Sequence, residues 1–588
     1  ILHMRLLYRC ILRLVSLGAF LLTLLACSPK GEETVTLHIL HTTDVHGNFL
    51  PFDYVKECPA TGSMARLAAY VGALRADGGQ PILLDGGDLL QGEPITYHYN
   101  FVDTATKHMG ARVLDYLQYD AMVVGNHDIE TGHRVYDRFV KETTCPLLAA
   151  NVLRDPKNPE ATYFTPYTMV ERSGIRVAIL GLTTTGVPRW LPSELYEGMY
   201  FADGLESARY WLPIIQKKEN PDVVIALLHS GRIDRDEGCR ENFATALTDS
   251  VPGIDLVLYG HDHQQHIEQR VNPKGDSVFM LTPGNHLDRV GDITITLKKK
   301  DGKVVGKKVE AGFTELDTYD PDEEFMKQFS QDAEAIESFV NRPIVSLSAP
   351  IRTEDALFGF SEYVGLIHEV QLATTGAEIS FAAPLTENQT VPRGDLTVGR
   401  MFALYPFENY LYVINMTGRE VKDYLEYSYS RWVKQMKSAS DHILLLEEAP
   451  DSTGRFITKY PMFNFSSAAG IDYTVDVSKP MGQRIKIEKM SSGAPFHLDE
   501  TYIVVLNSYR ANGGGGLLTK GAGIPKEELK DRIIWTTFKD VRTYMIEILS
   551  EKGPVLLPLA SRPNWRFVPV YWAESAIVAD RKFLLDNQ

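Results

Sequence analysis

Cysteine is scarce in this sequence. The 588 residues include five cysteines, and none of them forms a Cys-x-x-Cys pair. Such pairs are typical of thiolate metal sites, so we interpret the cysteines as structural residues. After the first 30 residues only Cys58, Cys145 and Cys239 occur, and a set of three permits at most one internal disulfide.

The sequence also lacks a long basic run, and its 76 acidic residues outnumber 60 Lys and Arg, which gives a net charge of −16. Clustered Lys and Arg hold the phosphate backbone of nucleic acids, so we expect no nucleic-acid polymer as a partner. The net charge does not exclude small phosphorylated substrates, because a bound metal ion can supply the positive charge that holds a phosphate. No apolar span of 20 residues follows residue 30, so we expect no membrane crossing after that point.

The first 27 residues predict an export signal. Arg5, Arg9 and Arg13 precede an apolar run over residues 14–26, which is short for a transmembrane helix. The run ends in Leu-Leu-Ala-Cys27, which resembles a bacterial lipobox, where the cysteine is lipidated and becomes the first residue. Several acyl chains on one cysteine give stable anchoring. We therefore expect an exported protein that a lipid on Cys27 anchors to a bacterial cell membrane, on its periplasmic or surface face.

Hydrophobic residues make up 44% of the chain, as in ordinary globular proteins, and the length suggests at least two domains. Near-continuous apolar runs alternate with helical segments from residue 35 to about residue 313, which predicts an α/β (α+β) domain. We expect strands at residues 35–40, 81–85, 121–124, 177–180, 223–228 and 256–259, and a hairpin around residues 293–305. Nearly every strand ends in a polar cluster, and sites in α/β sheets form outside the carboxyl ends of strands.

The polar clusters form an ordered set of metal-ligand residue types: Asp44-x-His46, Gly87-Asp88, Gly125-Asn126-His127-Asp128, His229 and Gly260-His261-x-His263. The set resembles that of the calcineurin-like metallophosphoesterases in residue type and in order. The resemblance implies a four-layer catalytic domain over residues 35–320 that binds two divalent metal ions. Mixed carboxylate, amide and imidazole ligands suit Mn, Zn, Co or Fe, and two such ions can hold the attacking and leaving oxygens of a phosphoryl transfer.

The same resemblance assigns the ligands to the two ions: Asp44, His46 and His263 to one, Asn126, His229 and His261 to the other, with Asp88 bridging both. His127 would face the substrate and stabilise developing charge or protonate the leaving oxygen. A carboxylate should orient His127, and the spacing in related nucleotidases selects Glu130 for this role. For Asp128 a surface position is an equal alternative.

The remaining histidines are expected to be packing or solvated residues rather than ligands. They include the Gly284-Asn285-His286 string, which lacks a following acid, and also His41, His98, His108, His133 and His266.

A second domain of mixed α/β pattern is predicted over residues 346–552, after a polar linker helix at residues 321–345. Together the two domains resemble the bacterial 5′-nucleotidases, in which a nucleotide-binding domain follows the phosphoesterase domain. That family stacks the base between two aromatic rings, which makes Phe407 and Tyr509 the candidate pair and Asn409 a candidate hydrogen-bonding group. Core packing is the alternative for both rings. The tail at residues 553–588 is rich in Pro and aromatics, and we assign it no role.

The sequence departs from typical 5′-nucleotidases at two places, and both bear on the choice of substrate. Typical 5′-nucleotidases have an Asn-Gly-Gly-Gly-x-Arg string where residues 380–385 are Ser-Phe-Ala-Ala-Pro-Leu, and they carry an Asp for the ribose hydroxyls near the position of Gly515. At both places the sequence resembles that of the 2′,3′-cyclic-nucleotide 2′-phosphodiesterase/3′-nucleotidase branch. We therefore expect hydrolysis of extracytoplasmic 2′,3′-cyclic and 3′-nucleotides to nucleoside and phosphate. The alternatives are a 5′-nucleotidase or nucleotide-sugar hydrolase, and a non-catalytic surface-binding lipoprotein.

Overall fold

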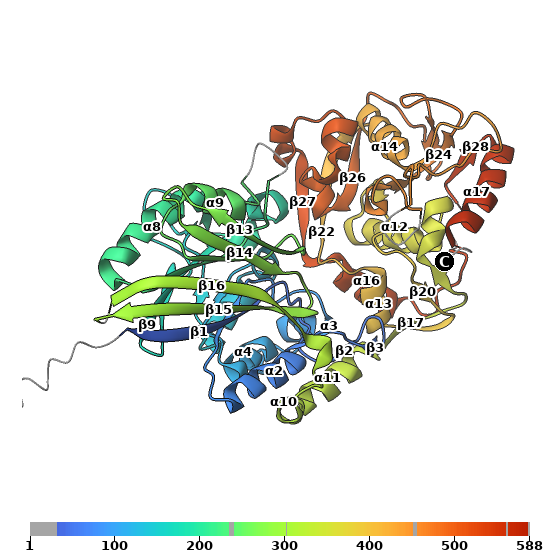
Figure 1. Ribbon diagram of the computed structural model, residues 1–588. Helices are drawn as coiled ribbons and strands as arrows, with labels where there is room; N and C mark the ends of the chain where they lie inside the picture. The colour runs from blue at the N-terminus through green and yellow to red at the C-terminus, as the bar shows by residue number, and fades with distance from the viewer. Residues whose placement is uncertain (1–31, 235–239, 302, 451–455, 560–562, 586–588) are drawn as a thin grey trace, which may run out of the picture.

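The computed structural model describes residues 32–234, 240–301, 303–450, 456–559 and 563–585, so the expected lipobox at Cys27 lies outside the described residues. The chain folds into two domains that lie side by side, one drawn blue to green and the other yellow to red (Figure 1). Among the described residues, no helix has the length and apolar character that a membrane span requires.

Two six-stranded sheets form the centre of the first domain, in the orders β16-β15-β1-β4-β5-β6 and β13-β14-β12-β11-β9-β8. The first consists of β16 (Lys303–Glu315), β15 (Arg289–Lys300), β1 (Glu33–Thr42), β4 (Ile82–Asp85), β5 (Ala121–Val123) and β6 (Leu147–Leu148). The second consists of β13 (Gln265–Val271), β14 (Ser277–Pro283), β12 (Leu256–Tyr259), β11 (Val223–His229), β9 (Ile175–Thr183) and β8 (Tyr167–Arg172). The six expected strands and the β15–β16 hairpin are all present.

Each central strand is apolar on both faces, because both faces are covered. Side chains of a strand point alternately to opposite faces, so Ile39 of β1 joins the cluster between the two sheets while Leu40 joins a cluster under helices. The covering helices are α2 (Met64–Ala76), α4 (Met109–Leu117) and α6 (His133–Glu142) on the first sheet, and α8 (Gly204–Glu219) and α9 (Ala244–Ser250) on the second. Figure 1 shows α2 and α4 on the opposite side of the sheets from α8 and α9. The four-layer prediction is confirmed.

The segment between the domains forms two short helices, α10 (Glu323–Gln328) and α11 (Ser330–Val340), where one helix was expected. Phe329 interrupts them with φ −106° and ψ 20°. Both helices pack on the first domain, since Phe325 and Ile336 belong to the cluster under its sheet and Asp332 accepts a hydrogen bond from Arg112 at 3.0 Å. The chain then enters the second domain as β17 (Pro343–Leu347), which pairs with β21 (Gly394–Thr397).

A five-stranded sheet in the order β23-β19-β26-β22-β27 forms the centre of the second domain. Its strands are β23 (Ser467–Ala469), β19 (Ile379–Ala382), β26 (Thr501–Asn507), β22 (Tyr410–Thr417) and β27 (Ile533–Asp540). The helices that pack around it include α12 (Glu362–Thr375), α13 (Val398–Leu404), α14 (Gly418–Trp432) and α16 (Val541–Glu551). The cluster under the first domain's helices continues into this domain through Phe402 and Tyr405, so the two domains share buried apolar surface.

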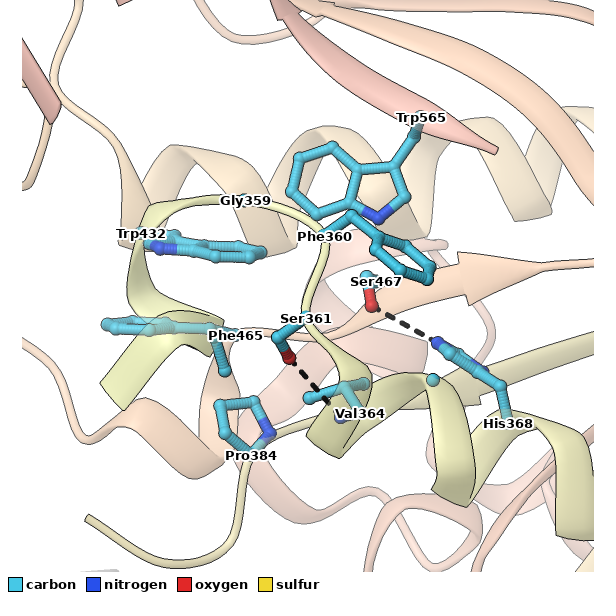
Figure 2. A pocket seen from close by; sticks show the side chains of 12 residues that line it. Gly359, Phe360, Ser361, Val364, His368, Pro384, Trp432, Phe465, Ser467 and Trp565 are labelled. Atoms are coloured by element: carbon cyan, nitrogen blue, oxygen red, sulfur yellow. Dashed lines mark hydrogen bonds between the residues drawn. The ribbon is translucent and has the colours of Figure 1, made fainter. Parts of the chain in front are cut away.

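A small cavity of about 10 Å³ lies inside the second domain, beside α12. Figure 2 shows its aromatic wall, in which Trp432 and Phe465 stack with ring centroids 5.6 Å apart, and its polar side, where His368 Nε2 lies 3.1 Å from Ser467 Oγ. A volume of this size holds about one water molecule. The cavity is therefore a packing defect of the core and not a ligand site.

The tail that the sequence left without a role is part of the second domain. β28 (Trp565–Val568) completes a three-stranded sheet with β24 (Ile471–Asp476) and β25 (Ile485–Met490), and α17 (Val570–Leu585) follows it. Trp565 and Phe567 are buried in the domain's core. In Figure 1, β28 and α17 lie at the outer end of this domain, away from the first domain.

Candidate metal centre and interdomain cavity

The predicted ligands converge at one edge of the first domain. Asp44, Asp88 and Asn126 lie just beyond β1, β4 and β5, which are parallel neighbours in the first sheet. His229 ends β11, and His261 and His263 lie just beyond its parallel neighbour β12 in the second sheet. Because both sheets present the carboxyl ends of these strands at the same edge, residues up to about two hundred positions apart are brought together.

Two groups of side chains there have donor atoms close enough to hold a metal ion, namely Asp44 with His46 and His263, and Asp88 with His229 and His261. In the first group, His263 Nε2 lies 3.1 Å from His46 Nε2 and 3.4 Å from Asp44 Oδ1. In the second, His229 Nε2 lies 3.1 Å from both Asp88 Oδ2 and Asn126 Oδ1. All seven predicted ligands are thus at the edge, and Asp88, which was predicted to bridge the two ions, lies with the second group. Their role as ligands stays a prediction.

Hydrogen bonds to backbone carbonyls orient two of the imidazole rings. His46 Nδ1 lies 2.9 Å from Gln91 O, and His229 Nδ1 lies 2.7 Å from Gly86 O. A carbonyl oxygen only accepts, so Nδ1 carries a proton in both rings and Nε2 is directed at the cluster. Metal-binding histidines are commonly oriented in this way by a partner on the other ring nitrogen. The donor set therefore fits a pair of divalent cations.

The local electrostatics agree with this fit. Burial alone would lower the pKa of His229, but the Asp88 and Asp44 carboxylates outweigh burial and raise the pKa to about 9. The proton on His229 thus compensates the negative charge of these two carboxylates, as a bound cation would. Burial lowers the pKa of His46 to about 3, so this imidazole is neutral and able to donate its Nε2 lone pair.

Five of the seven ligand residues have left-handed backbone conformations, with φ between 49° and 82°: Asp44, His46, Asp88, His261 and His263. Such conformations are uncommon for residues other than glycine and concentrate at functional sites. The adjacent glycines leave room for the carboxylates. A Cβ on Gly125 would lie 2.1 Å from Asp88 Oδ1, and one on Gly260 would lie 2.5 Å from Asp44 Oδ2.

His127 stands beside the second group, on the short helix α5 (Asn126–Glu130). Its backbone N–H donates to Asp88 Oδ1 at 2.8 Å, and its Nδ1 lies 2.5 Å from Glu130 Oε2. Burial alone would lower the pKa of His127, but the Asp88 and Glu130 carboxylates outweigh it and raise the pKa to about 10. His127 is therefore protonated at neutral pH and can donate a proton. The pairing with Glu130 that the sequence favoured is present.

Asp128, the other acid considered for pairing with His127, is fully buried and binds backbone N–H groups instead. Its carboxylate accepts backbone N–H groups of Asp88 at 3.0 Å, of Leu89 and Leu90 at 2.9 Å, and of Gly125 at 2.8 Å. Asp128 thus joins the loop after β4 to the loop after β5. The surface position considered for Asp128 is excluded.

A cavity of about 400 Å³ extends from this edge into the second domain. Asn126, His127, Glu130 and His261 line it on one side, and Phe407, Asn409 and Tyr509 line it on the other. The rings of Phe407 and Tyr509 are 43% and 38% exposed, so core packing, the alternative for both, does not describe them. The structure thus brings all the predicted substrate-binding residues to one cavity with two of the predicted metal ligands, Asn126 and His261. Binding itself stays a prediction.

Several further residues of the site were missed by the sequence analysis. Phe463 lies edge-on to Tyr509 with ring centroids 6.2 Å apart, and Trp190 packs beside the His261 ring at 5.6 Å. Glu241 Oε1 lies 3.1 Å from His261 Nε2, and all three residues line the cavity. Their local sequences carry no motif that would have distinguished them. Asn285, from the discounted Gly-Asn-His string, lies 3.2 Å from His263 Nδ1 and so supports a ligand without being one of the seven.

Comparison with known proteins agrees with the two domains. A family model described as calcineurin-like phosphoesterase matches residues 37–265, and one described as 5′-nucleotidase, C-terminal domain, matches residues 351–520. The chain is 26% identical over 606 residues to a Haemophilus influenzae protein named 2′,3′-cyclic-nucleotide 2′-phosphodiesterase/3′-nucleotidase, with 92% of this chain and 89% of that protein covered.

Two further matches differ in coverage. The chain is 26% identical over 624 residues to the trifunctional nucleotide phosphoesterase protein YfkN of Bacillus subtilis, which covers 95% of this chain but only 41% of that longer protein. A crystal structure of a putative 5′-nucleotidase from Staphylococcus aureus superimposes with a TM-score of 0.69 at 19% identity, covering 91% of this chain and 100% of that one. The superposition with the Staphylococcus aureus structure shows that the two chains share a fold.

Proposed function

Since the chain belongs to the 5′-nucleotidase family, with a calcineurin-like phosphoesterase domain followed by a 5′-nucleotidase C-terminal domain, we propose that it hydrolyses phosphate esters of nucleotides at the interdomain cavity. The chain is a phosphoester hydrolase. The preferred substrates in our proposal are 2′,3′-cyclic nucleotides and 3′-nucleotides, with nucleoside and phosphate as the final products.

One observation carries the proposal. The same cavity is lined by two of the proposed metal ligands, Asn126 and His261, together with His127 from one domain, and by the exposed residues Phe407 and Tyr509 from the other. A base stacked between the two rings would leave its sugar phosphate at the metal edge. Aromatic stacking tolerates any base and is worth roughly 1–3 kcal/mol per base.

The family implies divalent metal ions, and the seven ligands fit two of them. When bound, the cations supply Lewis acidity that activates water and neutralises charge on the phosphate. His127 holds a proton on a ring that Glu130 orients, and it donates that proton to the leaving oxygen. The complete ligand set argues against the non-catalytic alternative.

The charges in the cavity favour esterified ribose oxygens over a free diol. Among the described residues, three carboxylates line the cavity, and each has a positively charged or imidazole partner: Glu130 with His127, Glu241 with His261, and Glu408 with Arg542. Each of these carboxylates is thus already engaged by a partner, which makes it a poorer acceptor for a free ribose diol. Asn409, Asn507 and Ser508 offer neutral polar groups instead. A 2′,3′-cyclic phosphate needs no diol acceptor.

We also propose that the enzyme acts outside the cytoplasm, anchored by a lipid on Cys27. The support is the basic, apolar and Leu-Leu-Ala-Cys succession of the first 27 residues. Substrates would then be extracytoplasmic nucleotides.

A substrate panel on purified protein loaded in turn with Mn, Zn and Co tests the proposal. We expect 2′,3′-cyclic AMP and 3′-AMP to have the highest kcat/KM, ahead of 5′-AMP, UDP-glucose and bis(p-nitrophenyl) phosphate. A clear preference for 5′-AMP or UDP-glucose would replace the cyclic and 3′ assignment by the 5′ alternative. No turnover of any nucleotide with any metal would reject the proposed function.

A further inference from the structure

The loop of residues 405–409 carries two of the proposed base-binding residues, Phe407 and Asn409, between α13 and β22. It has no regular secondary structure. The Phe407 ring is 43% exposed, so its own packing contributes little to holding the loop in place. Contacts of the loop's other residues must therefore determine where this ring stands.

Beside the burial of the Tyr405 ring, these contacts include three hydrogen bonds from Arg542, at the start of α16. Its Nη1 donates to Tyr405 O at 3.1 Å and to Pro406 O at 3.2 Å, and its Nη2 donates to Glu408 Oε1 at 3.1 Å. One guanidinium thus binds the residues on both sides of Phe407. A planar group with several fixed donors is suited to such a clamp, and a lysine ammonium is not.

The clamp is buried. Arg542 is 0% exposed and Glu408 is 3% exposed. A buried carboxylate and a buried guanidinium are each costly alone, so each requires the other in this position. The backbone adds a further contact beside them, in which Val541 N–H donates to Asn409 O at 2.7 Å. The first turn of α16 therefore holds the loop at four of its five residues.

The same arginine also contacts the first domain. Its guanidinium carbon lies 3.7 Å from the centre of the Phe402 ring and 5.2 Å from that of Tyr97, which belongs to the first domain. The Tyr97 hydroxyl is hydrogen-bonded to Thr543, the next residue of α16. The anchor of the aromatic loop is thus also a contact between the two domains.

We infer that Arg542 is a positioning residue for nucleotide binding, which presents Phe407 and Asn409 to the cavity by clamping residues 405, 406 and 408. The inference rests on the proposed function, because it concerns how the base site is built. Arg542 itself does not line the cavity among the residues described there.

The test compares Arg542→Met with Arg484→Met. Arg484 is a matched control, since it is a buried arginine of the same domain that donates to the carbonyls of Lys479, Tyr429 and Val433, away from the cavity. Adenosine binding to the metal-free protein is measured by calorimetry, and KM and kcat for 2′,3′-cyclic AMP are measured after metal loading.

We expect Arg542→Met to weaken adenosine binding and to raise KM by about tenfold, within the range for loss of one stacking contact, while kcat changes much less. Arg542→Lys should lie between this variant and the wild type. Arg484→Met should lower Tm but leave adenosine affinity and KM near wild-type values. Unchanged adenosine affinity in Arg542→Met, or an equal loss in Arg484→Met, would overturn the inference.

A double variant covers the case in which Arg542→Met folds poorly. Glu408→Gln in the same chain replaces the buried carboxyl that has lost its arginine partner with a neutral amide, so Arg542→Met/Glu408→Gln should regain Tm while KM stays high. A double variant with wild-type KM would also overturn the inference. Wild-type protein that binds no adenosine and hydrolyses no nucleotide would instead reject the proposed function, and this inference with it.

Discussion

At the scale of single residues, the chemistry of this protein depends on a few strained positions. Asp44 and Asp88 take left-handed conformations that a flexible loop would not retain, and buried hydrogen bonds hold them there. Asp88 N–H, for example, donates to Asp128 Oδ2 at 3.0 Å. Backbone strain of this kind costs about 1–3 kcal/mol per residue and is maintained where the surrounding structure determines the conformation. The surrounding structure therefore fixes the conformation of these two predicted ligand residues.

The first prediction concerns the ligands. Asp88→Asn or His229→Ala should abolish nucleotide turnover and lower the bound metal measured by elemental analysis, because the first removes the negative charge of a donor in the second group and the second removes a donor imidazole. Circular dichroism should be close to that of the wild type. His133→Ala is the control, since His133 pairs with Asp137 outside the ligand set and should retain metal and activity. Full turnover by thoroughly metal-stripped wild-type protein would contradict a metal mechanism.

The second prediction concerns pH. Metal-free protein holds a proton on His229 below about pH 9, since the neighbouring carboxylates raise its pKa to about 9. A metal ion binds the neutral imidazole, so binding must release that proton. Titration calorimetry at pH 7.5 in buffers of different ionisation enthalpy should show about one proton released from this group per protein. Apparent affinity should rise with pH up to about 9. A release that does not diminish as pH approaches 9 would contradict the assignment.

At the scale of secondary-structure elements, the loops that follow the neighbouring parallel strands β4 and β5 are hydrogen-bonded to each other. Asp128 of the short helix α5 accepts hydrogen bonds from four backbone N–H groups, three of them in the loop after β4 and the fourth, that of Gly125, just before α5. Water does not reach these buried N–H groups, so it cannot take the place of the carboxylate as their acceptor. Each N–H group left without an acceptor costs about 1–3 kcal/mol. The Asp128 carboxylate therefore couples the loop after β4 and the loop after β5 into one structural unit.

The third prediction concerns the C-terminal elements β28 and α17. Trp565 is 4% exposed and stacks on Tyr473 with centroids 5.8 Å apart, so Trp565→Ala should destabilise the second domain by about 3–5 kcal/mol. Tyr571→Ala is the control, because this ring of α17 is 73% exposed. Denaturant unfolding measures both. A Trp565→Ala protein as stable as the control would show that these elements are dispensable.

At the scale of the whole molecule, the two domains divide the work. The first domain supplies the metal groups and His127, while the second supplies the aromatic rings and meets the first across the 400 Å³ cavity. Contacts such as the hydrogen bond from Asn512 Nδ2 to Trp190 O at 3.3 Å cross the boundary next to the cavity. The proposed function therefore predicts that substrate choice and phosphoester chemistry belong to separate parts of the chain and can be altered separately.

The fourth prediction uses this division. Tyr509→Ala should raise KM for 2′,3′-cyclic AMP roughly 5- to 150-fold, the equivalent of losing about 1–3 kcal/mol of stacking. Turnover of bis(p-nitrophenyl) phosphate, which has no base to stack, should hardly change, because the metal groups and His127 are untouched. Steady-state kinetics on both substrates give the answer. Equal losses on both would indicate damage to the fold in place of a lost base contact.

The fifth prediction concerns location. Cys27→Ser should leave the protein unlipidated and soluble outside the cytoplasm, because the acyl chains are its only proposed membrane anchor. Fractionation of cells expressing the wild type and the variant, with and without globomycin, measures this. Membrane association that neither the substitution nor the inhibitor changes would contradict a lipid anchor on this cysteine.

Local pattern in the sequence was enough to determine eight of the twelve strands in the two central sheets of the first domain and the candidate metal-ligand residue types that follow several of them, but not β6, β8, β13 and β14. A strand buried on both faces must be apolar throughout, and a polar cluster directly after it is visible in any reading of the chain. The family resemblance, now confirmed, supplied the order of the ligands and the aromatic pair. None of this required knowledge of distances.

Only the tertiary structure decided which acid contacts His127, that Phe407 and Tyr509 are exposed in a cavity, and that the tail completes the second domain. It also placed Glu241 beside His261, and Arg542 behind the aromatic loop, over a hundred residues away. These features depend on burial and on contacts between distant segments. Neighbouring residues do not determine such contacts, because the packing of whole domains sets which side chains meet and which stay open to solvent.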